Sequence, residues 1–385
     1  MRISGKAYKS IFNLFLIFTT AGFLWYVMQP KNLVSDKLKN NIQSSQSSEI
    51  PFTELSYRLD YSNHDPLTIE NISLFGEEEK WHGSGFFDKD LYSEYPTSLN
   101  LAGSGKNNIV VTKNVALNLS KILNFDLALY YKSNPTYLEK GELFFLDNNK
   151  NKTSFVLPKL DGGWNFIDIP KEQFNNQENF NWAAISSAEF SFTPRPLTSI
   201  ALNLGSLRGQ AGQIVHNDWN SVNKKMLLLD KRNGEIGLLV RNISGAVATI
   251  KKITSVTNFI FQCSYRPLST SAGGIFFRGN YENGQGYYFT LGGINSNGWQ
   301  LYKIGQKGTE TLAKGNINNF KFQFQDKYHL KIETKMNNIK TYFSNDGEKY
   351  VLLTSVNDNE FTSGGVGVAV SPAGVSLFND FIFNQ

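Results

Sequence analysis

Short runs of alternating apolar and polar residues fill the chain from about residue 51 to its end. In the segment 328–333, YHLKIE, every second residue is apolar. Clusters of Asn, Gly, Pro and Asp separate such runs, and SNDGEKY at 344–350 contains the Asp-Gly pair of a tight hairpin. A period of two is typical of strands that bury one face. The sequence therefore predicts an all-β protein.

The N-terminus has a different pattern. Residues 11–28, IFNLFLIFTTAGFLWYVM, carry no charge and follow a basic segment at 1–10. At 1.5 Å per residue they extend about 27 Å, close to the thickness of the hydrocarbon layer. Trp25 and Tyr26 near the end favour an uncleaved transmembrane signal anchor over a secretory signal peptide, which stays open as the alternative. The polar residues 29–50 predict a flexible stalk.

The strand candidates fall into two groups. Residues 51–207 contain seven or more candidates, such as FDLALYYKS and SIALNLGSL, and residues 214–385 contain a second series. A short stretch rich in small residues, RGQAGQ at 208–213, lies between them. So many short strands between turn signals predict antiparallel β-sandwiches or jelly rolls. We expect two such domains in tandem after a single transmembrane helix.

Composition narrows the classes of function. The chain of 385 residues has 30 Phe, 17 Tyr and 6 Trp, and its net charge of +5 is spread without a long basic run. This distribution gives no support to a nucleic-acid partner. The single cysteine, Cys263, excludes an intrachain disulfide and a Cys-based zinc site, and its alternating surroundings predict a buried side chain.

The first region resembles the galactose-binding-domain-like jelly roll of several carbohydrate-binding modules. The segments SLNLAGSG, GGWNFIDIPKEQF and FNWAAISSAEFSF carry the resemblance, over about 150 residues. It implies the fold, and by association a glycan or protein partner. A structural calcium ion in this domain stays open, although the DNNKNK run at 147–152 lacks the glycine and glutamate of a calcium loop and predicts a hairpin turn.

The second region resembles the concanavalin A-like lectin/glucanase sandwich, in particular its laminin-G-like branch and the bacterial 3-keto-disaccharide hydrolase domain. AGGIFFRG with GYYFTL, WQLYKIG, YHLKIETKMNNIKTYFSNDG and GGVGVAVSPAGVSLFNDFIF carry this resemblance in the expected order. It implies a two-sheet sandwich with a sheet face suited to sugars.

Five residues are candidates for carbohydrate binding. Alternation places Phe276 and Arg278 on one face of a strand, so Arg278, Tyr288 and either Trp299 or Tyr302 would line a concave sheet with a donor fork and flat rings. An equally open alternative is that these residues only cover a sandwich face or contact the neighbouring domain. Trp81, in a loop-like stretch, is the candidate exposed ring of the first region.

No catalytic residue emerges from the motifs. The sugar-cleaving relatives of the sandwich place carboxylates in an E-x-D-x-x-E run, which this chain lacks, and no nucleophile elbow, Walker loop or H-E-x-x-H motif occurs. The leading hypothesis is therefore a membrane-anchored, non-catalytic protein of the cell envelope that binds extracellular or cell-wall polysaccharide. The alternatives are a glycosidase-type enzyme acting on a modified sugar and an adhesion or assembly protein that binds other proteins.

The leading hypothesis also predicts where the chain works. Domains that bind extracellular glycans lie outside the cytoplasm, so we expect a single-pass membrane protein with periplasmic or extracellular β-domains, or a secreted protein if the signal is cleaved. No cofactor is predicted, and the location of any metal site stays unknown.

Overall fold

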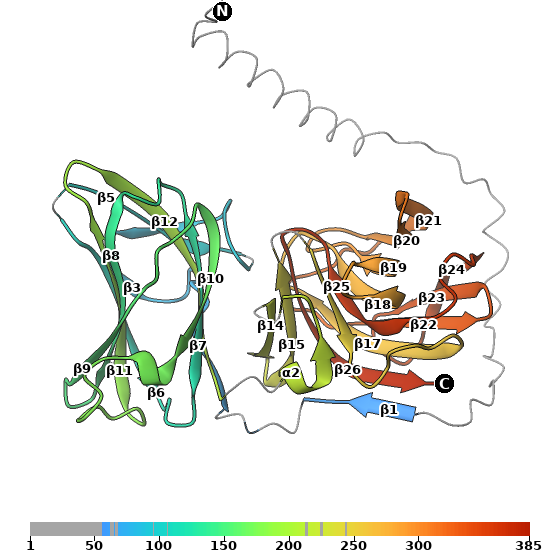
Figure 1. Ribbon diagram of the computed structural model, residues 1–385, viewed down its shortest axis with the longest axis horizontal. Helices are drawn as coiled ribbons and strands as arrows, with labels where there is room; N and C mark the ends of the chain where they lie inside the picture. Colours follow the sequence, from blue (N-terminus) through green and yellow to red (C-terminus); the bar gives the residue numbers. More distant parts are fainter. Residues whose placement is uncertain are drawn as a thin grey trace, which may run out of the picture. The chain divides into compact units, whose positions relative to one another are not determined.

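The regular structure of the described part of the chain is almost entirely antiparallel strand, which confirms the predicted all-β class (Figure 1). The structure is a computed structural model that describes residues 56–61, 65, 68–94, 96–105, 107–211, 215–223, 226–242 and 245–385. The predicted anchor at 11–28 and stalk at 29–50 lie outside these residues. Within the described ranges, no helix is long and apolar enough to cross a membrane.

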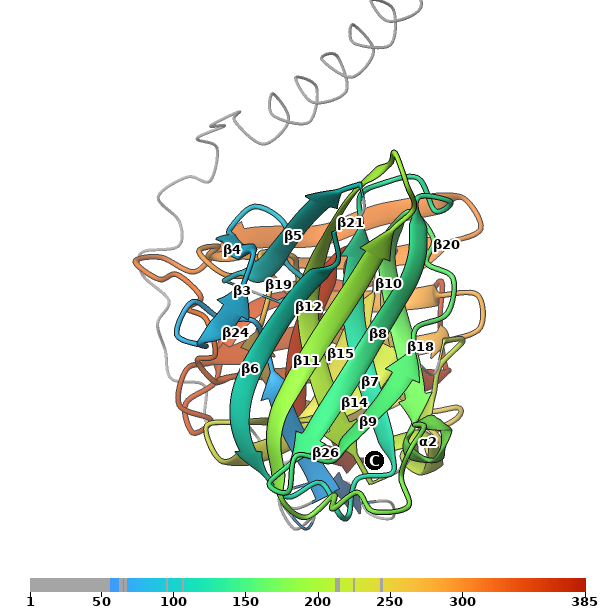
Figure 2. The same ribbon diagram turned by 90° about the vertical axis from the view of Figure 1, so that its left-hand side faces the viewer.

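The first sandwich consists of two sheets that enclose one apolar core. One sheet has the order β10-β7-β12-β5-β4, with β2 also paired to β12. Its strands are β10 (Gly163–Pro170), β7 (Asn124–Tyr131), β12 (Ser199–Gln210), β5 (Ser98–Ser104), β4 (Gly85–Asp88) and β2 (Ile69–Ser73). The other sheet, seen in front in Figure 2, contains β3 (Trp81–Gly83), β6 (Ile109–Leu117), β11 (Ile185–Pro194), β8 (Leu138–Asp147) and β9 (Lys152–Val156).

The second sandwich also consists of two sheets. Its larger sheet contains β14 (Leu227–Arg232), β15 (Glu235–Asn242), β26 (Gly374–Asn384), β17 (Phe259–Pro267), β22 (Tyr328–Lys335), β23 (Asn338–Ser344), β24 (Val351–Asn357) and β1 (Ser56–Leu59). The seven-stranded sheet has the order β13 (Trp219–Asn220), β16 (Ala246–Ile250), β25 (Gly365–Val370), β18 (Gly273–Asn280), β19 (Gln285–Leu291), β20 (Gly298–Gly305) and β21 (Gly308–Asn316). A four-residue helix, α2 (Val215–Asp218), precedes β13.

Period-two alternation decides which side chains enter the cores. In β22 the residues Tyr328, Leu330 and Ile332 are buried, and the residues between them are partly exposed. Cys263 in β17 is buried as predicted. The DNNKNK run forms the turn between the paired strands β8 and β9, where the Asp147 carboxylate accepts hydrogen bonds from the backbone N–H groups of Asn149 and Asn151. This bonding confirms the predicted hairpin.

The arrangement is not a simple tandem, because the first sandwich is inserted into the second. Strand β1 pairs with β26 at the C-terminal end of the chain, with Ser56 opposite Asn384. The Trp219 indole N–H then donates to the Tyr61 hydroxyl at 2.7 Å, inside the second core. The expected boundary at residue 51 therefore needs correction, since residues 56–61 belong to the second sandwich and only the following strands build the first.

The predicted bridge at 208–213 also differs from the structure. Arg208 and Gln210 are buried in the last residues of strand β12 rather than in a bridge between two domains. The Arg208 guanidinium contacts the carboxylates of Glu94 and Asp230, and the Gln210 amide donates to the Leu229 carbonyl. Polar side chains therefore connect the two sandwiches directly, which sequence alternation alone does not reveal.

Candidate functional site

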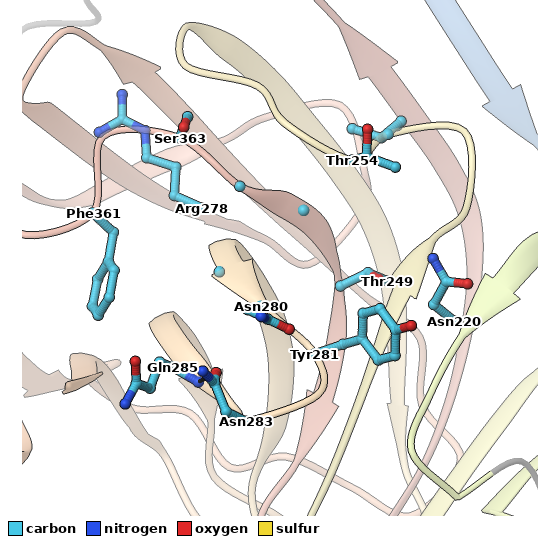
Figure 3. A pocket seen from close by; sticks show the side chains of 14 residues that line it. Asn220, Thr249, Thr254, Arg278, Asn280, Tyr281, Asn283, Gln285, Phe361 and Ser363 are labelled. Carbon is cyan, nitrogen blue, oxygen red and sulfur yellow. Dashed lines mark hydrogen bonds between the residues drawn. The ribbon is translucent and has the colours of Figure 1, made fainter. Parts of the chain in front are cut away.

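A pocket of about 450 Å³ lies at one end of the seven-stranded sheet (Figure 3). It is formed where β18 ends, β19 and β25 begin, and the loops after β16 and β24 approach one another. The lining residues are Asn220, Thr249, Ile253, Thr254, Arg278, Gly279, Asn280, Tyr281, Asn283, Gln285, Phe361, Ser363, Gly364 and Gly365. This volume is within the range of small-ligand pockets in proteins.

The lining is rich in uncharged hydrogen-bonding groups. It contains four carboxamides and four hydroxyl groups, at Asn220, Asn280, Asn283, Gln285, Thr249, Thr254, Tyr281 and Ser363. The side-chain oxygens of Asn280 and Asn283 accept from the backbone N–H groups of Glu282 and Gln285 and so hold the turn 280–285. Their NH2 groups have no partner among the described residues, which leaves them as donors at the pocket.

Arg278 lines the pocket, but its guanidinium donates hydrogen bonds to backbone carbonyls rather than facing a ligand. A β-bulge interrupts β18 after Phe277, and Arg278 adopts a φ of 46°, so strict alternation fails here. Its Nε and Nη2 groups donate to the Thr257 carbonyl at 3.0 and 2.6 Å, and Nη2 also donates to the Met336 carbonyl. The sequence predicted that Arg278 shares a face with Phe276 and presents its guanidinium to a ligand. The bulge and these hydrogen bonds show that this prediction was wrong.

Glycine permits the close backbone contact behind the pocket. Gly364 has a φ of 153°, and a Cβ built on it would lie 2.4 Å from the Gly279 nitrogen and 2.5 Å from the Arg278 carbonyl carbon. The Gly364 carbonyl also accepts from the Val256 N–H. The loop that follows β24 is thereby packed directly on the bulge of β18, and its residues Phe361 and Ser363 reach the pocket.

We expect Gly364→Ala to lower the free energy of unfolding by about 2 kcal/mol or more, since it adds a backbone clash to an unfavourable φ. Urea denaturation measures this loss. Gly308→Ala is the matched control, because Gly308 has a φ of 102° but open space around its Cα. Equal losses in the two variants would contradict the importance of the loop contact.

Tyr288 and Tyr302 lie together on the outer face of the seven-stranded sheet, as expected for a shared face. Their rings are stacked with centroids 4.9 Å apart, and the ring of Phe276 contacts Tyr288 edge to face. Tyr288 is only 5% exposed and donates its hydroxyl to the Gly284 carbonyl. Burial raises the pKa of Tyr302 to about 12, so its hydroxyl stays protonated.

The two tryptophan candidates have mainly structural contacts. Trp299 packs against the core on the face of β20 that carries Leu301, and it therefore does not share the face of Tyr302. Trp81 is partly buried, stacks on Phe75 with ring centroids 4.9 Å apart, and donates its indole N–H to the Ser73 hydroxyl. Trp81 is therefore not the exposed ring that the sequence predicted, and Trp299 does not join Tyr288 on one sheet face.

The structure therefore separates the predicted residues. Only Arg278 lines the pocket, while Tyr288 and Tyr302 lie on a sheet face and the tryptophans pack on the cores. The polar residues of the turn 280–285 and the ring of Phe361 were missed. The signal for the turn was present in NYENGQ, where two asparagines and a glycine surround one tyrosine.

The pocket contains no pair of carboxylates. Its lining has neither Asp nor Glu. Nearby, Asp358 and Glu360 are both ion-paired with the buried Lys303, at 2.7 and 2.9 Å. Glycoside hydrolysis needs an acid and a base or nucleophile on opposite sides of the scissile bond. In the described part of the chain, no group of three or more His, Cys, Asp or Glu side chains is placed to hold a metal ion.

Comparisons with known proteins give distant structural likenesses only. No family model and no curated protein sequence matches the chain. A carbohydrate-binding module of family 66 from Bacillus subtilis is 18% identical over 44% of this chain and 96% of its own, with a TM-score of 0.35. A Bacillus subtilis protein of unknown function with a galectin-like fold is 14% identical over 44% of this chain and 90% of its own, with a TM-score of 0.33.

A family 11 carbohydrate-binding module of a cellulosomal cellulase from Clostridium thermocellum is 14% identical over 41% of this chain and 95% of its own, with a TM-score of 0.27. At these scores the likenesses do not establish a family. The two superfamily resemblances of the sequence stay predictions, whereas the β-sandwich architecture is evident from the sheets themselves.

Proposed function

We propose that this chain is a non-catalytic carbohydrate-binding protein of the cell envelope, and that the pocket at the end of the seven-stranded sheet holds an uncharged segment of extracellular or cell-wall polysaccharide. The observation that carries this proposal is the lining itself, with carboxamides, hydroxyl groups and two aromatic rings but no carboxylate. The predicted N-terminal anchor would hold the β-domains at the outer surface of the membrane.

The lining matches the chemistry of a neutral sugar. A sugar hydroxyl both donates and accepts, and a carboxamide offers both functions at one side chain. The C–H faces of a pyranose or furanose ring pack on aromatic rings, and Figure 3 shows Tyr281 and Phe361 on opposite sides of the pocket. Amide groups and flanking rings together favour a hydroxyl-rich, uncharged ligand.

The alternatives receive less support. A hydrolase would need two carboxylates facing each other across the ligand, and the lining supplies none. Of the acidic side chains close to the pocket in sequence, Asp358 and Glu360 are ion-paired with Lys303. Glu282 lies in the turn 280–285, and its carboxylate accepts a hydrogen bond from the Tyr281 hydroxyl at 3.4 Å. An adhesion protein would present a broad apolar patch, whereas the candidate site is a pocket whose lining includes four carboxamides and four hydroxyl groups.

We expect the full-length chain to be retained by at least one neutral polysaccharide in an affinity electrophoresis screen, and Tyr281→Ala or Phe361→Ala to weaken retention about tenfold through loss of ring contact. Tyr137→Ala is the control, because Tyr137 is 40% exposed on the first sandwich. A folded chain that no neutral polysaccharide retains, or a control that weakens retention equally, would refute the proposed pocket.

A further inference from the structure

Phe361 lies on a loop whose position is fixed from inside the second core. The loop connects β24 to β25 and spans residues 358–364. The hydroxyl of the fully buried Tyr287 makes two hydrogen bonds with this loop. It donates to Asp358 Oδ1 at 2.5 Å and accepts from the Phe361 N–H at 3.2 Å. One hydroxyl therefore bonds the loop at both its first residue, Asp358, and its pocket-lining residue, Phe361.

The Asp358 carboxylate completes this network. Its Oδ2 accepts from Lys303 at 2.7 Å, and its Oδ1 also accepts from the Glu360 N–H at 3.0 Å. Burial raises the pKa of Asp358, but the hydrogen bonds from Lys303 and Tyr287 outweigh it and hold the pKa below the usual range. The carboxylate is therefore a permanent acceptor that orients the Tyr287 hydroxyl toward the loop.

Ring contacts fix Tyr287 itself. Its ring stacks on Phe277 in the core with centroids 5.3 Å apart, and meets the edge of Phe361 with centroids 5.4 Å apart at 87°. Phe277 is fully buried. The orientation of Phe361 thus depends on buried residues of strands β18 and β19 as well as on its own loop.

We propose that Tyr287 is a positioning residue of the pocket, which fixes Phe361 for ring contact with a sugar through its hydroxyl without lining the pocket itself. This inference rests on the proposed function. A hydroxyl that bonds both Asp358 and the Phe361 backbone reduces the conformational freedom that the loop would lose on binding, and such preorganisation increases affinity.

The test compares Tyr287→Phe with Tyr265→Phe in the full-length chain. Both variants remove one buried hydroxyl, but the Tyr265 hydroxyl donates to the Gly292 carbonyl, which belongs to a different loop. We expect Tyr287→Phe to weaken binding of the retained neutral polysaccharide about tenfold and to accelerate amide hydrogen exchange at Phe361 about tenfold. Tyr265→Phe should change neither property.

A double-mutant cycle separates positioning from general destabilisation. If Tyr287 acts through Phe361, Tyr287→Phe should have almost no further effect on affinity in the Phe361→Ala background. Additive losses, or unchanged exchange at Phe361 in Tyr287→Phe, would overturn the inference. If the wild-type chain retains no polysaccharide, the proposed function fails, while the exchange measurement still decides whether Tyr287 holds the loop.

Discussion

A fragment that begins at residue 214 is expected to lose at least about 3 kcal/mol of free energy of unfolding relative to one that also contains residues 56–61. The fragment lacks strand β1, which pairs with β26 over Phe381–Asn384. It also lacks Tyr61, which is 1% exposed and hydrogen-bonded to Trp219. Its removal opens a cavity beside Phe381 and leaves backbone groups of β26 unpaired.

The comparison is made by urea denaturation of two proteins. One contains residues 214–385, and the other joins residues 56–61 through a short flexible linker to the same residues 214–385. Insertion of the first sandwich predicts that the joined protein has the higher free energy of unfolding and the higher urea midpoint. Equal stability of the two would show that β1 is dispensable and would contradict the insertion.

Arg208→Met is expected to destabilise the chain by about 3 to 5 kcal/mol, since it removes one partner from a buried ionic network. Arg208 is fully buried and contacts Glu94 at 2.6 Å and Asp230 at 3.3 Å. Arg232 contacts the same two carboxylates. Without Arg208, two buried carboxylates would share a single guanidinium, leaving one negative charge without compensation.

Calorimetry and urea denaturation measure this loss. Lys121→Met is the control, because the ion pair of Lys121 with Asp65 is exposed and should contribute less than about 1 kcal/mol. A loss of that size in Arg208→Met as well would contradict the view that the network joins the two sandwiches.

The same network predicts a pH dependence. Burial raises the pKa of Asp230, but Arg208 and Arg232 outweigh it and hold the pKa well below the usual range of an aspartate. A carboxyl group whose pKa is lower in the folded than in the unfolded chain stabilises the fold at pH values above its unfolded pKa. This stabilisation is lost as the pH falls toward its folded pKa. Stability should therefore decline below about pH 4, and less steeply in Arg208→Met.

Sequence patterns predicted the strands well because one buried face imposes a period of two. The residues of β22 and the hairpin at Asp147 follow directly from this rule. The insertion could not be predicted in the same way, since the pairing of β1 with β26 joins residues at opposite ends of the chain. A strand of four residues has too little pattern to indicate its partner.

The candidate site was harder to predict than the fold. The bulge at Arg278 breaks the alternation that would have placed its side chain beside Phe276. The pocket is assembled from turns and loops that meet only after both sheets have formed. Phe361 illustrates this limit, because its position depends on Tyr287, 74 residues earlier in the chain.

The most direct test of the central claim maps the bound polysaccharide by hydrogen exchange. The full-length chain is compared with and without the neutral polysaccharide that it retains most tightly. The proposed site predicts slower exchange in the turn 280–285 and in the loop 358–364. Slower exchange confined to the first sandwich, or to the strands carrying Tyr288 and Tyr302, with the turn and the loop unchanged, would contradict it.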